Sequence, residues 1–553
     1  MKRFHIILDI LAGSLLAVWL AGGIPWNGKL LLRHGADPRR AAVILCLIAW
    51  FALPALRDKS IFLKGARAIM KWLEKPSARW GLFAFAFFWS CALGILQTLS
   101  LRYPLFDVGL FHQILWGISH GHGFTSNISG AGNFLLDHSS VSLVLLAPVY
   151  SLTNSSPLTI APLHSALLFG GIAAWIYLAA RAPGLDHPAR NSLAAAVTVF
   201  ALSFDSLWSN MRWGFHENAI AFTALSWAFA LTFSDKRSPW HLCAAVLLSL
   251  VAAGSKELLL VDVAILFFVW SWSLTSRMPS SIRRITGIAV FMGLALTLIL
   301  LFIAFETMPH PAEKNYFNRY YAYLGLNLGD FARTIFFSPW KIIENIGAME
   351  LLKYVNTILL PWLALPLAWV WWTLRDGRKN LRSNLTTALV LFSIIPSIAS
   401  AALSTYTPLR RSGFHYVLEL WPVMAALTIL ALARIESSGR WKGFAWLWAV
   451  FSMVALGQDP WGQLKEYGRD AYRASPARFA MQLIPADTGI AADEMSGPWL
   501  ASRINTSRWP DVSIFKDGKP AWIVLNGMKE APEGYDAAWA EGSWRGFELR
   551  KNQ

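Results

Sequence analysis

The sequence has 553 residues, of which 55% are hydrophobic and only 15% are charged. Soluble domains average about 25% charged residues, so this composition excludes an ordinary soluble multidomain enzyme, and it equally excludes disordered and collagen-like chains. The formal net charge of +16 would suggest a nucleic-acid partner if the protein were soluble. In a membrane protein, basic residues instead hold loops on the cytoplasmic side. We therefore predict a polytopic membrane protein with no nucleic-acid partner.

Apolar runs long enough to cross a bilayer need roughly 17–25 residues. We predict about thirteen transmembrane helices, at 6–24, 41–57, 80–99, 157–180, 191–209, 217–233, 240–254, 256–275, 285–305, 352–374, 384–403, 413–433 and 441–457. The first is interpreted as an uncleaved span rather than a signal peptide. Every second loop is short and basic, which places the N-terminus in the cytoplasm and the C-terminus outside. The basic loop 25–40 disagrees with this pattern, so the topology of the first two spans stays open.

The chain divides into three expected parts. Residues 1–79 form a two-span hairpin followed by a basic amphipathic segment, 60–78, on the cytoplasmic membrane face. Residues 80–457 form the transmembrane core, with large outer loops at 100–156 and 306–351. Residues 458–553 shift to a soluble composition and contain strand-like runs within 484–495 and at 521–527. The expected fold class is therefore mainly α, with a small C-terminal α/β domain outside the membrane.

Ionisable residues gather in the predicted outer segments, beginning with the first outer loop. Asp107 follows a span directly in an otherwise apolar stretch and begins a short helix, which favours a functional carboxylate over a helix cap. His112 lies one position off the face that Asp107 shares with Phe111. Asp137 and His138 open a further apolar helix at 139–153, where capping of that helix is an equal explanation for Asp137.

Two more clusters of ionisable residues lie at the ends of predicted transmembrane helices. His216 and Glu217 lie between the spans 191–209 and 217–233. Ionisable neighbours at such a position are costly unless they are paired or functional. Lys256 and Glu257 lie between two apolar runs, and a local Lys–Glu pair competes with a phosphate-binding role for the ammonium group of Lys256.

The fourth cluster breaks the charge rule. Arg410 and Arg411 are basic residues on the predicted outer side, so they need an anionic partner. A lipid head group or a pyrophosphate would supply one. His415 and Tyr416 enter the next span, where His415 and Glu419 share one helical face.

Together, the four clusters place carboxylates, imidazoles and cations at one membrane surface. A carboxylate can act as general base on an acceptor hydroxyl, while cations stabilise a departing phosphate. The sequence contains no P-loop, GxGxxG or HExxH motif, so it does not support ATP hydrolysis. It assigns no cofactor; a divalent metal ion stays open, since His120 and His122 alone are too few ligands.

Several separated segments carry a family resemblance over roughly residues 80–530. FDVGLFHQILWGISHGHGF, LLDHSSVSLVLLAPVYSL, GFHENAIAF, GSKELLL and HYVLELWP occur in the same order as in the bacterial membrane proteins known as domain of unknown function 2079. That family resembles, more distantly, the GT-C glycosyltransferases. The resemblance implies a GT-C-like fold in the bacterial cytoplasmic membrane, a polyprenyl-phosphate sugar as donor at the outer face, and Asp107 as the catalytic carboxylate.

The leading hypothesis is a membrane glycosyltransferase of the cell envelope. Asp107 would be the base, and His216 and Glu217 would orient the acceptor or share the proton. Lys256 with Arg410 or Arg411 would hold the phosphate, and the remaining substrate-binding candidates are His112, Asp137, His138, Glu257, His415 and Tyr416. The alternatives are a lipid or solute transporter or flippase, and a non-catalytic envelope assembly protein. The sugar and the extracytoplasmic acceptor stay unidentified.

Overall fold

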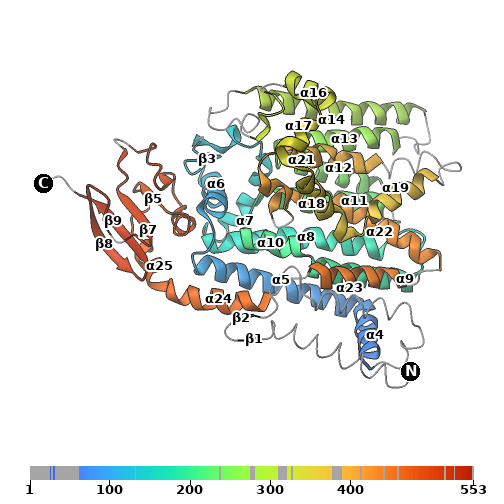
Figure 1. Cartoon of the computed structure of the whole chain (residues 1–553), viewed down its shortest axis with the longest axis horizontal. Helices are drawn as coiled ribbons and strands as arrows, with labels where there is room; N and C mark the ends of the chain where they lie inside the picture. The colour runs from blue at the N-terminus through green and yellow to red at the C-terminus, as the bar shows by residue number, and fades with distance from the viewer. Residues whose placement is uncertain are drawn as a thin grey trace.

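The structure is a computed structural model. It describes strands β1 (Pro25–Trp26) and β2 (Lys29–Leu30), and residues 61–130, 132–235, 238–273, 281–308, 320–325, 328–375, 389–411, 414–439, 443–456, 460–515, 518–528 and 530–550. The predicted spans 6–24 and 41–57 lie outside the described residues. The remaining chain forms a helical bundle that carries a small sheet at its C-terminal end (Figure 1).

The basic amphipathic segment predicted at 60–78 is helical. Helix α4 (Ile61–Glu74) ends where Pro76 begins helix α5 (Pro76–Leu99), and proline at a first helical position is compatible with a new helix but not with a continued one. Helix α4 stands at an angle to α5, which runs along the edge of the bundle (Figure 1). Its location on the cytoplasmic membrane face stays a prediction.

Three helices of the described residues are long and apolar enough to cross a membrane by themselves. They are α5, the continuous stretch Pro157–Ala180 that contains α8 (Ile160–Ala180), and α14 (Ser281–Thr307). Up to five spans result if each of two bent helix pairs counts as one. The predicted number of thirteen is therefore not confirmed.

The two bent pairs coincide with the predicted spans at 191–209 and 352–374. Helix α9 (His187–Ser203) meets α10 (Asp205–Trp213) at an angle of 41°, and the stretch Ala348–Trp362 meets α19 (Leu365–Arg375) at 76°. At the second bend, Leu363 and Ala364 adopt positive φ angles of 47° and 53°. Such backbone cannot continue a right-handed helix, although every side chain in the run is apolar enough.

The other apolar runs form shorter helices around a shared core. They are α11 (Asn218–Phe233), α12 (Pro239–Ala253), α13 (Glu257–Ser273), α21 (Ile395–Leu403), α22 (Trp421–Ser437) and α23 (Phe444–Leu456). Helix α22 is buried along almost its whole length, as a central helix is. Its Trp421 donates to Ser206 at 2.9 Å and packs against the fully buried Trp362.

Helix α14 lies at the edge of the bundle and exposes its apolar side chains. Ile282 is 76% exposed, Leu296 60% and Leu301 51%. A helix that is apolar on its outward face is typical of contact with lipid, because in water this face would be buried.

The predicted outer loop 100–156 contains short elements only. They are the π-helix η1 (Leu105–Gly109), helix α6 (Leu110–Ser119), strands β3 (Thr125–Ser126) and β4 (Gly132–Asn133), the 3-10 helices η2 (Phe134–Leu136) and η3 (Val141–Leu146), and helix α7 (Ala147–Ser151). The helix predicted at 139–153 is thus divided into η3 and α7. Ser140, rather than Asp137, occupies the position before η3, so Asp137 does not cap it.

The C-terminal residues form the predicted α/β structure. Helices α24 (Pro460–Arg473) and α25 (Ser475–Gln482) precede a five-stranded sheet of order β6-β5-β7-β9-β8. Its strands are β5 (Ile490–Ala492), β6 (Thr506–Arg508), β7 (Trp522–Asn526), β8 (Tyr535–Glu541) and β9 (Trp544–Leu549), with β5 parallel to β6 and β7. We call residues 460–550 the C-terminal unit.

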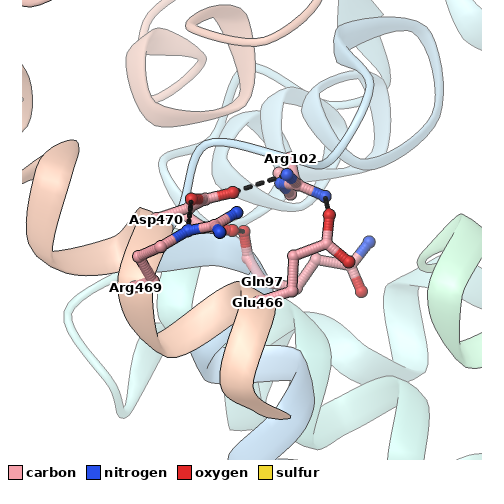
Figure 2. A network of polar contacts seen from close by, with 6 residues as sticks. Gln97, Arg102, Glu466, Arg469 and Asp470 are labelled. Atoms are coloured by element: carbon pink, nitrogen blue, oxygen red, sulfur yellow. Dashed lines mark hydrogen bonds and ion pairs between the residues drawn. The ribbon is translucent and has the colours of Figure 1, made fainter. Parts of the chain in front are cut away.

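An arginine at the end of α5 joins the helical bundle to the C-terminal unit (Figure 2). The guanidinium of Arg102 contacts Glu466 at 2.6 Å and Asp470 at 2.5 Å, both on α24. Arg469 also contacts Asp470, at 3.0 Å. The first outer loop and the C-terminal unit are thereby held side by side.

Candidate active site at the first outer loop

Asp107 and His216 meet at one end of the bundle. Asp107 lies in η1, and its Oδ1 is 3.2 Å from Nε2 of His216, which follows helix α10. The two side chains are 23% and 10% exposed. The capping position of η1 is occupied by Pro104, so Asp107 does not cap this helix. The functional interpretation of the Asp107 carboxylate stays a prediction.

Gly214 makes this approach possible. Its backbone has φ 102° and ψ −171°, a region that side-chain-bearing residues rarely enter. A Cβ at this position would overlap the side chain of Val108 in η1 and would lie 3.1 Å from the ring of Tyr103. The loop that carries His216 therefore packs directly against the element that carries Asp107.

His216 stands between two carboxylates. Its Nδ1 is 3.7 Å from Oε2 of the buried Glu217. Burial by itself opposes the charged imidazole, but the hydrogen bonds and charges of Asp107 and Glu217 outweigh it and raise the pKa of His216. A protonated imidazole in this position can orient the Asp107 carboxylate and take part in proton transfer.

A line of rings connects His216 to Lys256. The imidazole of His216 stacks on that of His415, with centroids 3.3 Å apart and planes inclined by 14°. The ring centroids of His415 and Tyr416 are 3.9 Å apart. The ammonium nitrogen of Lys256 lies 4.9 Å from the centre of the Tyr416 ring. A cation over an aromatic face is attracted to it, so Tyr416 positions Lys256.

His138 and Glu257 form a second pair beside Lys256. Nδ1 of His138 lies 3.2 Å and 3.3 Å from the two carboxylate oxygens of Glu257. Burial opposes the charge of His138, but the Glu257 carboxylate raises the pKa of His138 to about 9, with smaller contributions from Glu217 and Asp137. Within the described part of the chain, Lys256 itself has no acidic partner at ion-pair distance. The local Lys256–Glu257 pair is therefore not formed, and the ammonium group is available to an anion.

The two outer arginines differ from each other. Arg410 is buried and donates to the backbone oxygen of Ser404, while its Nε has no partner among the described residues. Arg411 is exposed. Among the residues that the structure describes, neither side chain contacts Asp107 or His216, so a shared role with Lys256 stays a prediction.

His112 and Asp137 occupy different surroundings. His112 is fully buried in α6, its Nε2 lies 2.6 Å from the hydroxyl of Ser502 in the C-terminal unit, and burial lowers the pKa of His112 to about 3. It is therefore a neutral contact residue between the two parts. Asp137 is buried after η2 and close enough to His138 to act on it electrostatically.

One residue near Asp107 was absent from the sequence-based candidates. The backbone oxygen of Glu494 accepts from the amide of Leu105 at 2.7 Å, and its Oε2 accepts from the amide of Phe106 at 3.3 Å. Arg508 contacts Oε1 of the same carboxylate at 2.6 Å. Glu494 follows the carboxyl end of β5, a parallel strand, and such strand ends commonly carry functional residues. That signal is visible only once the sheet topology is known.

The described residues contain no group of three or more His, Cys, Asp and Glu side chains that could hold a metal ion. His120 and His122 instead stack on Trp116, with ring centroids 4.7 Å and 5.4 Å away.

The apolar helices, the outward-facing apolar side chains of α14 and the charged cluster at one end define a mainly helical integral membrane protein. The family comparison agrees. The chain belongs to the family described as predicted membrane protein (DUF2079), whose family model matches residues 97–543. No curated protein is significantly similar to it in sequence.

Two similar solved structures are crystal structures of ArnT from Cupriavidus metallidurans. The one bound to undecaprenyl phosphate has a TM-score of 0.47 at 13% identity, over 86% of this chain and 98% of that chain. The apo structure has a TM-score of 0.46 at 12% identity with the same coverage. TM-scores this low do not establish a shared fold, so the GT-C-like fold stays a prediction.

Proposed function

We propose that the protein transfers a sugar from a polyprenyl-phosphate donor to an acceptor hydroxyl at the outer face of the bacterial cytoplasmic membrane. The observation that carries the proposal is the Asp107–His216 contact of 3.2 Å, which lies on the same line of side chains as the cation Lys256. A base and an anion-binding group at one site are what displacement of a phosphate by a hydroxyl requires.

Asp107 accepts the proton of the acceptor hydroxyl. The hydroxyl oxygen forms a bond to the anomeric carbon of the sugar while the bond from that carbon to the phosphate oxygen breaks. The electron pair leaves with the polyprenyl phosphate, whose added negative charge Lys256 stabilises. His216 and Glu217 hold the Asp107 carboxylate in position and share the proton.

The orientation in the membrane belongs to the same proposal. The short loops rich in Lys and Arg face the cytoplasm, which places the Asp107 cluster and the C-terminal unit outside. The family that the separated sequence segments resemble is itself more distantly similar to GT-C glycosyltransferases, which supports a lipid-linked donor, and undecaprenyl-phosphate sugars are the first donors to test.

The test uses the purified full-length protein with a panel of polyprenyl-phosphate sugars and measures the release of polyprenyl phosphate. We expect Asp107→Asn to lower turnover by roughly 100-fold or more, the usual contribution of general-base catalysis. Asp235→Asn is the matched control, because Asp235 is equally part-exposed but pairs with Arg190, at 2.6 Å. Equal turnover of wild type and Asp107→Asn would show that the assignment is wrong.

Buried carboxylates within the bundle favour transport as a second candidate function. Asp262 on α13 accepts from the hydroxyl of Ser397, and Glu419 accepts from Asn218 at 2.9 Å; both acids are almost fully buried. Ionisable residues inside a membrane bundle often mark a path for ions or substrates. Uptake or lipid scrambling by proteoliposomes, together with no turnover of any donor, would favour this function over transfer.

A further inference from the structure

A cavity of about 510 Å³ lies on the second outer segment, apart from the Asp107 cluster. Its wall consists of residues 322–325, helix α16 (Leu328–Phe337) and helix α17 (Trp340–Ile346). No residue of the Asp107 cluster lines it. Its volume falls within the range of about 300–1,000 Å³ that small-ligand sites usually have.

The lining offers groups that bind anions. Arg333 and Lys341 contribute two cations, and neither has an acidic partner at ion-pair distance among the residues that the structure describes. Thr334 and Ser338 add hydroxyl donors between them, and Asp330 is the acid in the lining. Guanidinium, ammonium and hydroxyl groups around one cavity match the oxygens of a phosphate.

The same two helices also expose a set of large apolar side chains. Phe336 is 79% exposed, Phe337 75%, and Trp340 and Ile343 55% each. Phe337 additionally lines the cavity. Exposed aromatic and aliphatic side chains next to cations are typical of helices in the head-group region of a bilayer. The ligand that fits both features is therefore amphiphilic rather than a free anion.

Tyrosines connect the cavity wall to the candidate active site. The hydroxyl of Tyr323 donates to the backbone oxygen of Leu403 at 2.7 Å. In the same segment, the ring of Tyr320 stacks on that of Tyr406, with centroids 5.0 Å apart. The centroids of Tyr406 and Tyr416 are 6.4 Å apart. The segment that carries the cavity wall is thus joined through Tyr320 and Tyr406 to Tyr416, which contacts Lys256.

We propose that this cavity binds the phosphate head group of an anionic membrane lipid. Arg333 and Lys341 contact the phosphate, while Phe336, Trp340 and Ile343 contact the acyl chains. The binding requires no sugar transfer, so it can be measured whether or not the proposed function is correct.

The experiment titrates the detergent-solubilised full-length protein with phosphatidylglycerol or phosphatidylcholine and counts bound lipid by native mass spectrometry. We expect wild type to prefer phosphatidylglycerol. Because each basic side chain near a lipid surface contributes about 1 kcal/mol, Arg333→Gln/Lys341→Gln should bind phosphatidylglycerol roughly 10- to 30-fold more weakly. Both side chains are exposed, so we expect an unchanged melting temperature.

The matched control removes two exposed cations that already have acidic partners. Lys353→Gln/Arg550→Gln should bind phosphatidylglycerol as wild type does, since Lys353 pairs with Glu350 and Arg550 with Asp536. Equal binding by the cavity variant and wild type would overturn the proposal, and so would equal binding of the two lipids to wild type. A third measurement adds inorganic phosphate as a competitor for bound phosphatidylglycerol. If it displaced phosphatidylglycerol at lipid-like concentrations, the site would be one for free phosphate and the lipid assignment would be wrong.

Discussion

The carboxylate of Glu494 accepts a hydrogen bond from the backbone amide of Phe106 at 3.3 Å, although 388 residues separate them. The neighbouring amide of Leu105 is bound by the backbone oxygen of Glu494. The first amides of a helix have no acceptor within that helix, and for η1 the C-terminal unit supplies the acceptors. The element that carries Asp107 is thus capped by a distant part of the chain.

Glu494→Ala should loosen η1 without unfolding the protein. The loss of a cap costs about 1 kcal/mol, so we expect faster hydrogen exchange of the amides of residues 105–109 and lower turnover with a little-changed KM for the donor. Glu494→Gln keeps an acceptor and should restore both properties. Arg508→Gln removes only the ion pair and serves as the control. Unchanged exchange in Glu494→Ala would contradict the capping role.

Gly214→Ala should disturb the approach of His216 to η1. The backbone conformation of Gly214 and the overlap of a Cβ with Val108 together predict a loss of about 3 kcal/mol or more. Gly121→Ala is the matched control: its φ is also positive, at 80°, but a Cβ there would meet nothing within 4 Å. Thermal unfolding in detergent should show a clearly larger fall in Tm for Gly214→Ala. Equal falls would mean that backbone conformation alone matters.

The His138–Glu257 pair should make stability depend on pH. His138 has a pKa of about 9 in the folded protein against 6.5 for an ordinary histidine. The pair therefore stabilises the fold fully below pH 6.5, and this contribution declines as the pH rises from 6.5 to about 9. His138→Gln should flatten the dependence of Tm on pH in that window. His187→Gln, at an exposed histidine outside the cluster, should leave the dependence as in wild type. A wild-type Tm that rises over this window would refute the pairing.

Arg102→Gln should weaken the junction between the bundle and the C-terminal unit (Figure 2). Because Arg102 is 37% exposed, water screens its ion pairs, and we expect a cost of about 1 kcal/mol. Hydrogen exchange of helix α24 should become faster in this variant. Arg469→Gln removes a more exposed arginine of the same network and should leave the exchange of α24 nearly unchanged. If both variants behave alike, Arg102 is not the residue that holds the junction.

Sequence patterns indicated residues that the structure brings together where ionisable clusters stand at the ends of helices. Asp107, His216, Lys256, His415 and Tyr416 were selected as ionisable or aromatic residues at mouths of apolar runs, and the structure connects them through successive contacts. Helix ends on one side of a bundle meet near one surface, so a one-dimensional pattern carries this information.

The hydropathy pattern of the sequence did not indicate where the backbone bends within an apolar run. The runs 191–209 and 352–374 are apolar throughout most of their length yet bend by 41° and 76°. Hydropathy averages over a window of residues, whereas a bend is a property of one or two φ angles.

By itself, the sequence determined that the chain is a mainly helical membrane protein, which family it belongs to, that its C-terminal residues form an α/β structure, and which ionisable residues stand apart from the apolar background. Each of these follows from composition or local order. The tertiary structure alone decided that Glu494 caps η1, that Glu257 pairs with His138 while Lys256 lies over the Tyr416 ring, and that a cavity with two cations lies on α16 and α17. The reason is physical: these contacts join residues far apart in the chain, and only the packing of helices and the register of parallel strands bring them within hydrogen-bond distance.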